Sequence, residues 1–156
     1  MRISTFVSMV AGVLILAACS DSTGADPMRL AELAQQESEW QDQNIHSYSF
    51  EYHHQFAGAI EAAEITVVAD TVAAAVDLEA DTLLSLDPSF AWPTVAALFA
   101  SAREALSSPD VNVTIEYEPT LNYPTRIDVS PVIATPAGGS TTSATNLHAV
   151  EPLGGE

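Results

Sequence analysis

The sequence predicts an α+β domain of two layers, in which two helices cover one face of an antiparallel sheet. Three observations support this prediction. Two segments repeat apolar residues at helical spacing, six segments favour strands, and their order along the chain is α-β-β-β-α-β-β-β. Most of the strands alternate apolar and polar residues, which is typical of a sheet with one face on the core and the other in water.

The first helix is predicted to begin at Asp26 and Pro27. Asp is a favourable N-cap because its carboxylate accepts hydrogen bonds from the first free N–H groups, and Pro suits the first helical position. The helix should end near 43–44. Four apolar residues lie close to one helical face: Leu30, Leu33, Ala34 and Trp40.

The clearest strand follows over 48–56. Its residues at even positions are aromatic or His, and they alternate with the polar residues Ser49, Glu51, His53 and Gln55. Gly58 interrupts it. Two further strands are predicted over 65–69 and 72–78, joined by a turn at 70–71. The three strands together form a meander.

A connection without periodicity, 79–92, leads to the second helix. This helix is predicted to begin at Pro93 and to end at 108–109, because Pro109 disfavours the helical conformation in the residue before it. Its apolar stripe consists of Val95, Leu98, Phe99, Ala102 and Leu106.

Three strands are predicted in the last part of the chain, over 111–117, 125–129 and 146–150. The segment 119–124 between the first two has the composition of a turn. The segment 135–142 contains Pro, two Gly and several hydroxyl residues, which predicts a mobile loop.

Residues 1–18 have the features of a signal peptide. Their apolar run, 6–18, is shorter than the about 20 residues that span a bilayer. The run ends in Leu-Ala-Ala-Cys at 16–19, which is similar to the bacterial lipobox. Cleavage would then fall between Ala18 and Cys19, and Cys19 would be lipidated. An ordinary secretory signal is the alternative.

Acyl chains on Cys19 would anchor the mature chain to a membrane without spanning it. Residues 19–26 would form a flexible tether, 27–150 a single α+β domain and 151–156 a flexible tail. Ser20 follows the cysteine, where inner-membrane lipoproteins of enterobacteria carry Asp. We therefore expect a location in the bacterial cell envelope, at the outer membrane rather than the inner one if the host has both.

The composition excludes several classes of partner. The chain has 21 acidic residues, four Lys and Arg residues, all of them arginine, and a net charge of −17. Nucleic acid and anionic lipid surfaces are recognised by clustered basic residues, so neither is an expected partner. The single cysteine excludes a disulfide framework and a Cys-rich zinc site.

Two motifs flank the middle of the chain. They are Trp40-Gln41-x-x-x-Ile45-x-x-Tyr48-Ser49-Phe50 and Ile115-x-Tyr117-x-Pro119-x-x-Asn122-Tyr123-Pro124-x-x-Ile127-x-Val129. Together with the Val-rich strands and the Thr94-Val95-x-x-Leu98-Phe99 helix between them, they resemble a bacterial family of small secreted or lipid-anchored domains, domain-of-unknown-function family 6174. The resemblance extends from Leu30 to Val150. It implies no activity, because the family has none assigned.

The chain departs from the family pattern at three places. The pair of cysteines that members often carry after the first strand is absent from 55–58. Asn122 stands where the family favours Gly, and we expect the turn to survive because Asn tolerates positive φ. The middle hairpin has Asp70-Thr71 where Asp-Gly is frequent, so its turn type should differ, because Thr disfavours positive φ.

The motifs share five aromatic residues: Trp40, Tyr48, Phe50, Tyr117 and Tyr123. We expect these residues, with Asn122 and Pro124, to be mainly structural and to pack in the core and at the joint between helix and strand. Tyr123 is the exception. It lies beside a proline in a predicted turn, so we expect it to be exposed and to face a partner.

Three histidines were considered as metal ligands. His53 and His54 are adjacent on a strand, point to opposite faces and cannot bind one ion together. His46 can share a face with His54, but aromatic residues occupy that face. We therefore expect one packed and two solvated histidines and no metal site.

The acidic residues Asp77, Glu79 and Asp81 have the spacing of a calcium loop. An EF-hand also needs Gly at its sixth and Glu at its twelfth position, where this chain has Thr82 and Pro88. A solvated acidic loop is therefore the favoured interpretation. A weak calcium site, to which Asp87 could contribute, is the alternative.

Catalytic motifs are absent from the sequence. It contains no G-x-S-x-G elbow, no H-E-x-x-H helix and no phosphate-binding Gly loop. Glu51, Glu116 and Asp128 are expected on the outer faces of neighbouring strands, where two carboxylates could do acid–base work. Solvated surface is the favoured interpretation of these residues, and no cofactor is expected.

The sequence therefore favours a lipid-anchored envelope protein without catalysis. It would bind another envelope protein or a peptide through an aromatic-lined sheet edge or a loop. The alternatives are an acidic calcium-responsive module and a small hydrolase with a carboxylate pair.

Overall fold

A computed structural model describes residues 26–87, 91–136 and 138–150 of the chain. Its element order confirms the predicted fold class, two helices and an antiparallel sheet in the order α-β-β-β-α-β-β-β. The elements are α1 (Pro27–Asp42), β1 (Tyr48–Phe56), β2 (Ala59–Val68), β3 (Thr71–Asp77), α2 (Val95–Ser107), β4 (Val111–Tyr117), β5 (Pro124–Pro131) and β6 (Ser140–Ala149).

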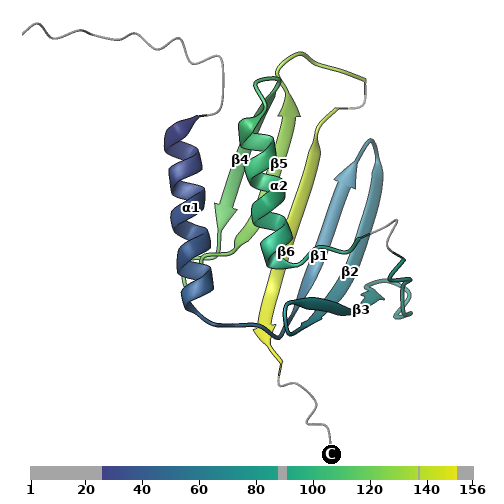
Figure 1. The fold of residues 1–156 in the computed structure, drawn as a ribbon. Coiled ribbons are helices and arrows are strands. Elements are labelled where there is room, and N and C mark those ends of the chain that lie inside the picture. Colours follow the sequence, from purple (N-terminus) through teal and green to yellow (C-terminus); the bar gives the residue numbers. More distant parts are fainter. Residues whose placement is uncertain (1–25, 88–90, 137, 151–156) are drawn as a thin grey trace, which may run out of the picture.

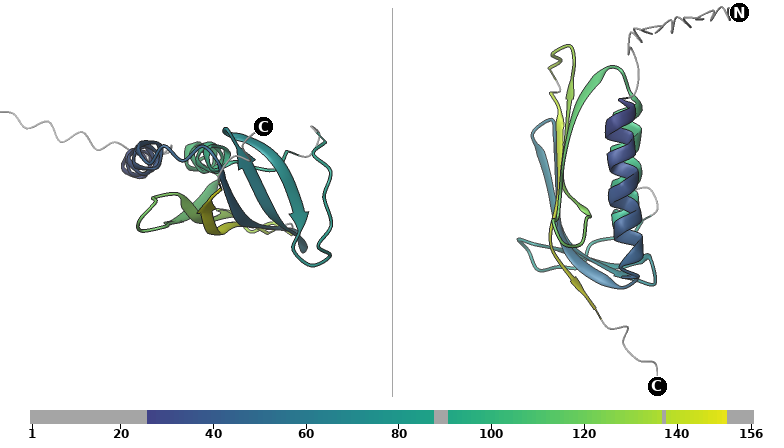
Figure 2. Two further views of the ribbon diagram at one scale, coloured as in Figure 1. Left: turned by 90° about the horizontal axis from the view of Figure 1, so that it is seen from below. Right: turned by 90° about the vertical axis from the view of Figure 1, so that its left-hand side faces the viewer.

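The six strands form one sheet in the order β3-β2-β1-β6-β5-β4, and every pairing is antiparallel. Both helices lie on the same face of this sheet, and α1 runs antiparallel to α2 (Figures 1 and 2). The other face carries no helix. The fold is therefore a two-layer structure with one covered face and one open face.

The first helix begins as its sequence predicts. The Asp26 carboxylate accepts a hydrogen bond from the Met28 N–H at 3.0 Å and a longer one from the Arg29 N–H at 3.5 Å. Pro27 occupies the first turn, where no N–H is needed. The second helix is capped in the same way, because the Thr94 hydroxyl oxygen accepts from the Ala97 N–H at 3.2 Å.

The hairpins on either side of β2 have two-residue turns. Ala57 and Gly58 join β1 to β2, and Ala69 and Asp70 join β2 to β3, all four with positive φ. Such turns match the right-handed twist of the strands. The second turn lies at 69–70 and not at the predicted 70–71, because Thr71 is already paired in β3, where it avoids positive φ.

The turn at 69–70 is held by the segment that enters β1. The Asp70 N–H donates to the His46 carbonyl at 2.9 Å, and the Ala69 N–H donates to the Ser47 hydroxyl at 3.1 Å. The His46 ring lies 2.8 Å from the Asp70 carboxylate. These contacts stabilise a backbone conformation that is unfavourable for residues other than Gly.

Two strands are longer than predicted. β2 begins at Ala59 and not at 65, since the tight turn brings 59–64 directly opposite the second half of β1. β6 begins at Ser140 and not at 146, because 140–145 pairs with β1 and 140–143 also pairs with β5. The prediction of a mobile loop reaching residue 142 was therefore wrong. The hydroxyl residues at the start of β6 are compatible with a strand whose backbone bonds to neighbouring strands.

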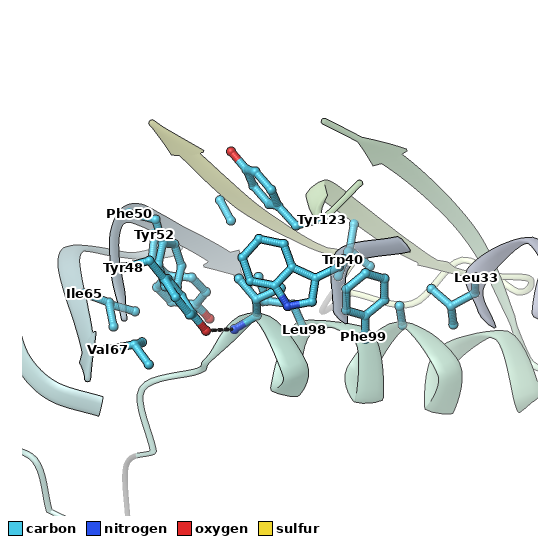
Figure 3. Close-up of a cluster of buried hydrophobic side chains, with 14 of the residues drawn as sticks. Leu33, Trp40, Tyr48, Phe50, Tyr52, Ile65, Val67, Leu98, Phe99 and Tyr123 are labelled. Atoms are coloured by element: carbon cyan, nitrogen blue, oxygen red, sulfur yellow. Dashed lines mark hydrogen bonds between the residues drawn. The ribbon is translucent and has the colours of Figure 1, made fainter. Parts of the chain in front are cut away.

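The core lies between the helices and the covered face of the sheet. Tyr48, Phe50 and Phe99 are almost completely buried in it (Figure 3). The Tyr48 ring contacts Trp40 of α1 edge to face, with ring centroids 5.5 Å apart. The Tyr48 hydroxyl accepts a hydrogen bond from the Val95 N–H at 3.0 Å. One side chain of β1 thus contacts both helices.

The Tyr48 hydrogen bond satisfies an N–H in the first turn of α2 that has no partner within the helix. Tyr48→Phe should lower the free energy of unfolding by about 1–2 kcal/mol, because the buried Val95 N–H loses its acceptor. Urea unfolding measures this loss. Tyr52→Phe is the matched control, since Tyr52 lies on the same face of β1 and its hydroxyl has no hydrogen bond within the described residues. Equal losses in the two variants would contradict the role given to the Tyr48 hydroxyl.

Candidate functional site

The aromatic residues of the two motifs meet at one place between the layers. Trp40 contacts the rings of Tyr48 and Tyr123 edge to face, at 5.5 and 5.9 Å between centroids. The exposure predicted for Tyr123 is wrong, since only 3% of its surface is accessible. Its ring is turned inward because Asn122 adopts positive φ just before it. This burial argues against a partner-facing role for Tyr123.

Burial also explains the titration behaviour of the tyrosines. It raises the pKa of Tyr52 to about 12, and the Glu61 carboxylate adds to the effect. Tyr117 on β4 likewise has its pKa raised to about 12 by burial and by Glu32 of α1, with Arg29 opposing the shift. The phenol groups are therefore protonated at neutral pH.

The histidines are placed apart. His46 contacts Asp70 in the β2–β3 turn, while the His54 ring nitrogen lies 3.0 Å from the Thr142 hydroxyl. His53 lies on the other face of β1, opposite Ala62 and Ser143. Within the described ranges, no group of three or more His, Cys, Asp or Glu side chains is arranged to hold a metal ion.

The acidic loop is closed by its own backbone. One Asp77 carboxylate oxygen accepts hydrogen bonds from the N–H groups of Glu79 and Ala80, at 2.8 and 2.7 Å. These bonds lower the pKa of Asp77. Asp81 adopts positive φ and donates its N–H to the Asp77 carbonyl. The spacing that resembles a calcium loop thus accompanies a tight turn in which Asp77 is an internal acceptor.

The three carboxylates considered for acid–base chemistry, Glu51, Glu116 and Asp128, do not all lie together on the sheet. Glu116 and Asp128 lie on neighbouring strands of the open face, but Arg126 lies opposite Glu116 and forms two hydrogen bonds with Asp128, at 2.6 and 3.1 Å. Glu51 is on β1, with β6 between it and β5. The Thr141 hydroxyl also donates to Asp128, and these hydrogen bonds lower the pKa of that carboxyl. Asp128 is therefore held as the anion, which is unfavourable for a general acid.

One pair of carboxylates was not predicted from the sequence. Glu51 lies directly opposite Glu64 on β2, and the Ser49 hydroxyl donates to Glu64 at 2.9 Å. The signal that could have revealed the pair is the two-residue turn at 57–58, which fixes the register of the hairpin. Ser49 itself is only 2% exposed and also lies 3.3 Å from the Ile65 carbonyl, so its hydroxyl is part of the packed sheet.

One edge of the sheet, formed by β3, is covered over its second half. The Leu84 N–H donates to the Ala75 carbonyl of β3 at 2.8 Å, and the Asp77 N–H donates to the Thr82 carbonyl at 2.9 Å. Leu83 forms a bridge with Val76 between these bonds. The connection after β3 therefore folds back and occupies backbone groups of 75–77 that an edge strand would otherwise expose.

The other edge, formed by β4, is open. Within the parts of the chain that the structure describes, β4 bonds only to β5. The Val132 N–H donates to the Asp110 carbonyl at 2.9 Å, which makes these two residues a hydrogen-bonded pair. Since such pairs alternate in an antiparallel ladder, the N–H and C=O groups of Val113 and Ile115 point away from β5.

The side chains of β4 give this edge two different faces. Asn112, Thr114 and Glu116 are exposed on the open face of the sheet. The residues of the covered face are apolar or aromatic and partly or fully buried: Val111, Val113, Ile115 and Tyr117. β4 has no proline and no lysine, two residues that commonly protect edge strands. A further extended segment could therefore continue both the backbone ladder and the core.

Comparison with protein families gives one match. The model of a family of unknown function, DUF6174, matches residues 32–152. The chain belongs to DUF6174. α1 begins just before the matched residues and the later helix and strands lie within them, so the aromatic contacts and the β4 edge lie in the matched region. No curated protein and no solved structure matches the chain.

The predicted signal peptide and the lipidation site at Ala18 and Cys19 lie outside the described residues, as does the tail at 151–156. Among the residues that are described, neither helix has the length and apolar character needed to cross a membrane.

The hydrogen bonds of Asp128 predict a pH dependence. Its pKa is lower in the folded protein than in the unfolded chain, so the carboxylate stabilises the fold above the unfolded pKa of about 4 and this contribution is lost as the pH falls through the folded pKa. Asp128→Asn should therefore destabilise the protein most at neutral pH, and the difference from wild type should shrink below about pH 4.

Urea unfolding at neutral and acidic pH measures this difference. Glu116→Gln is the control, because it leaves both hydrogen bonds between Arg126 and Asp128 in place. A difference between wild type and Asp128→Asn that is independent of pH would show that the carboxylate does not contribute as described.

Proposed function

We propose that the protein is a lipid-anchored component of the bacterial cell envelope that acts as a non-catalytic binding module. The observation that carries this proposal is the open β4 edge, in a sheet whose other edge strand is covered over its second half by the chain that follows it. An extended segment of another envelope protein, or a peptide, would add to β4 as a further strand. Main-chain hydrogen bonds would provide affinity, and the apolar face of β4 would select alternate side chains of the partner.

The charge of the chain supports a partner with basic residues. With a net charge of −17 and Glu116 exposed on β4, two copies of this protein repel each other. Arg126 is paired with Asp128 and Arg103 with Glu37, so these cations are already engaged. A segment that alternates apolar and basic residues would complement both the buried and the exposed face of β4.

The anchor in this proposal is the acyl-modified Cys19. The lipobox-like sequence at 16–19 supports it, and Ser20 supports the outer membrane in a diderm host. Peptide capture close to a membrane is a reasonable task for such a module, because anchoring raises its local concentration near other envelope proteins.

Replacement of Cys19 tests the anchor. Cys19→Ser should release the protein into the soluble fraction of broken cells, since no thioether-linked acyl chains can form. Ser20→Ala, which keeps the cysteine, should remain with the membranes. Sedimentation of Cys19→Ser with membranes would contradict the proposal.

Removal of one edge N–H tests the binding surface. Ile115→Pro deletes an N–H that points away from β5, so it should abolish pairing with a partner strand while leaving the β4–β5 ladder intact. Ile115→Ala is the matched control, because it also loses the isoleucine side chain but keeps the N–H. Crosslinking in intact cells, followed by affinity capture through a C-terminal tag, measures partner recovery.

We expect wild type and Ile115→Ala to recover a specific partner. Ile115→Pro should not recover it. Equal recovery with both variants would exclude strand addition at β4. Thermal unfolding of the two variants establishes that a loss of capture does not reflect a loss of fold.

A further inference from the structure

The described chain begins at one end of the elongated domain, and several other segments reach the same end. α1 starts there, while β6 ends at the opposite end (Figures 1 and 2). The Val132 N–H bonds to the Asp110 carbonyl, which places the β5–β6 connection beside the start of β4. Ala57 of the β1–β2 turn and Gly139 line one cavity, so this turn lies beside the same connection. We call this region the proximal end, defined by residues 26–29, 55–60, 107–110, 130–136 and 138–140.

Large apolar side chains are exposed at the proximal end. The structure describes eight exposed large hydrophobic residues, and five of them lie there. They are Met28 (81% exposed), Phe56 (50%), Ile60 (68%), Val132 (57%) and Ile133 (80%). The other three lie in or near the connection after β3. Exposed apolar residues gathered in one region mark a surface that contacts something other than water.

The proximal end is also poor in charge. No Asp, Glu, Lys or Arg occurs in 52–60 or 129–150, although the chain has 21 acidic residues. The charged groups within this region are Asp26, which caps α1, Arg29 and Asp110. Asp128 lines the cavity beside Ala57 and Gly139, and it is paired with Arg126. The opposite end, which we call the acidic end, carries Asp70 in the β2–β3 turn and Glu118 after β4. Since charges are costly to bring near hydrocarbon, the proximal end is the end best suited to approach a bilayer.

The tether would hold this end close to the membrane. Asp26 is the seventh residue after Cys19, and seven residues span at most about 25 Å when fully extended. α1 alone, with 16 residues, is about 24 Å long. An acyl-modified Cys19 therefore keeps the proximal end nearer to the bilayer than the acidic end.

We propose that the proximal end rests on the lipid surface, with Ile133, Val132 and Phe56 among the headgroups of uncharged or zwitterionic lipids. This inference rests on the lipid anchor of the proposed function. The long axis of the domain then stands away from the bilayer, and the β4 edge faces the aqueous side, open to a partner. The charge of −17 opposes close contact with anionic lipids, so the apolar side chains and the anchor together provide the attraction.

Lipid contact of single residues tests this orientation. Ile133→Cys and Thr120→Cys each introduce one thiol at an exposed position, the second in the β4–β5 turn at the acidic end. Cys19 is blocked by its thioether in the lipidated protein, so an environment-sensitive fluorophore labels only the new thiol. The labelled, lipidated full-length mature protein is incorporated into phosphatidylcholine vesicles that contain nitroxide-labelled phosphatidylcholine.

We expect the fluorophore at 133 to lose most of its emission to the nitroxide lipid and the fluorophore at 120 to keep its emission. Equal quenching, or quenching at 120 alone, would overturn the proposed orientation. A fluorophore at 133 that is shielded from water but not quenched by the lipid would show that a second copy or another protein covers this end, which also overturns the proposal.

Flotation of the same samples separates the two possible failures. Protein that floats with the vesicles but shows no quenching at 133 retains its anchor, so only the orientation is wrong. Protein that does not float has no anchor, and both the anchor and the orientation are then excluded.

Discussion

The helix layer is fixed to the sheet at Tyr48, whose ring packs against Trp40 of α1 and whose hydroxyl accepts the Val95 N–H of α2. Trp40 extends the contact to Tyr123, so the end of α1, the start of β1 and the start of β5 share one buried cluster. Trp40, Tyr48 and Tyr123 therefore form a joint between the helix layer and the sheet.

The two edges of the sheet differ. On one side the chain after β3 folds back, and the N–H groups of Leu84 and Asp77 form backbone hydrogen bonds that cover the second half of the edge strand. On the other side β4 follows α2 directly and has no outer neighbour among the described residues. The helices cover the apolar face of β4 but leave its edge open. Strong negative charge disfavours pairing between copies, which allows an open edge to persist without aggregation.

The periodicity of the sequence was sufficient for the helices and for β1, β4 and β5, because their apolar residues repeat at helical or strand spacing. It failed for the first half of β2, where Ile60, Glu61 and Ala62 are out of phase with the alternation of 63–67, and for β6, where Thr and Ser residues resemble a loop. Both segments are strands because neighbouring strands bond to their backbone, which is tertiary information.

The candidate site could also be predicted only in part from the sequence. The composition of β4 is visible in the sequence, but its position at an open edge depends on β6 lying between β1 and β5. Tyr123 was misjudged because turn residues are usually exposed, whereas the positive φ of Asn122 turns this ring into the core. The proposed anchor at Cys19, by contrast, is a local motif, and no part of the fold is needed to recognise it.

Amide hydrogen exchange along β4 tests the central claim, that this edge is open, most directly. The amides of Asn112, Thr114 and Glu116 bond to β5 and should be protected, whereas those of Val113 and Ile115 point outward and should exchange much faster. Alternation of fast and slow amides is the result that the account predicts. Uniform protection from 111 to 117 would show that another segment already occupies the edge and would contradict the account.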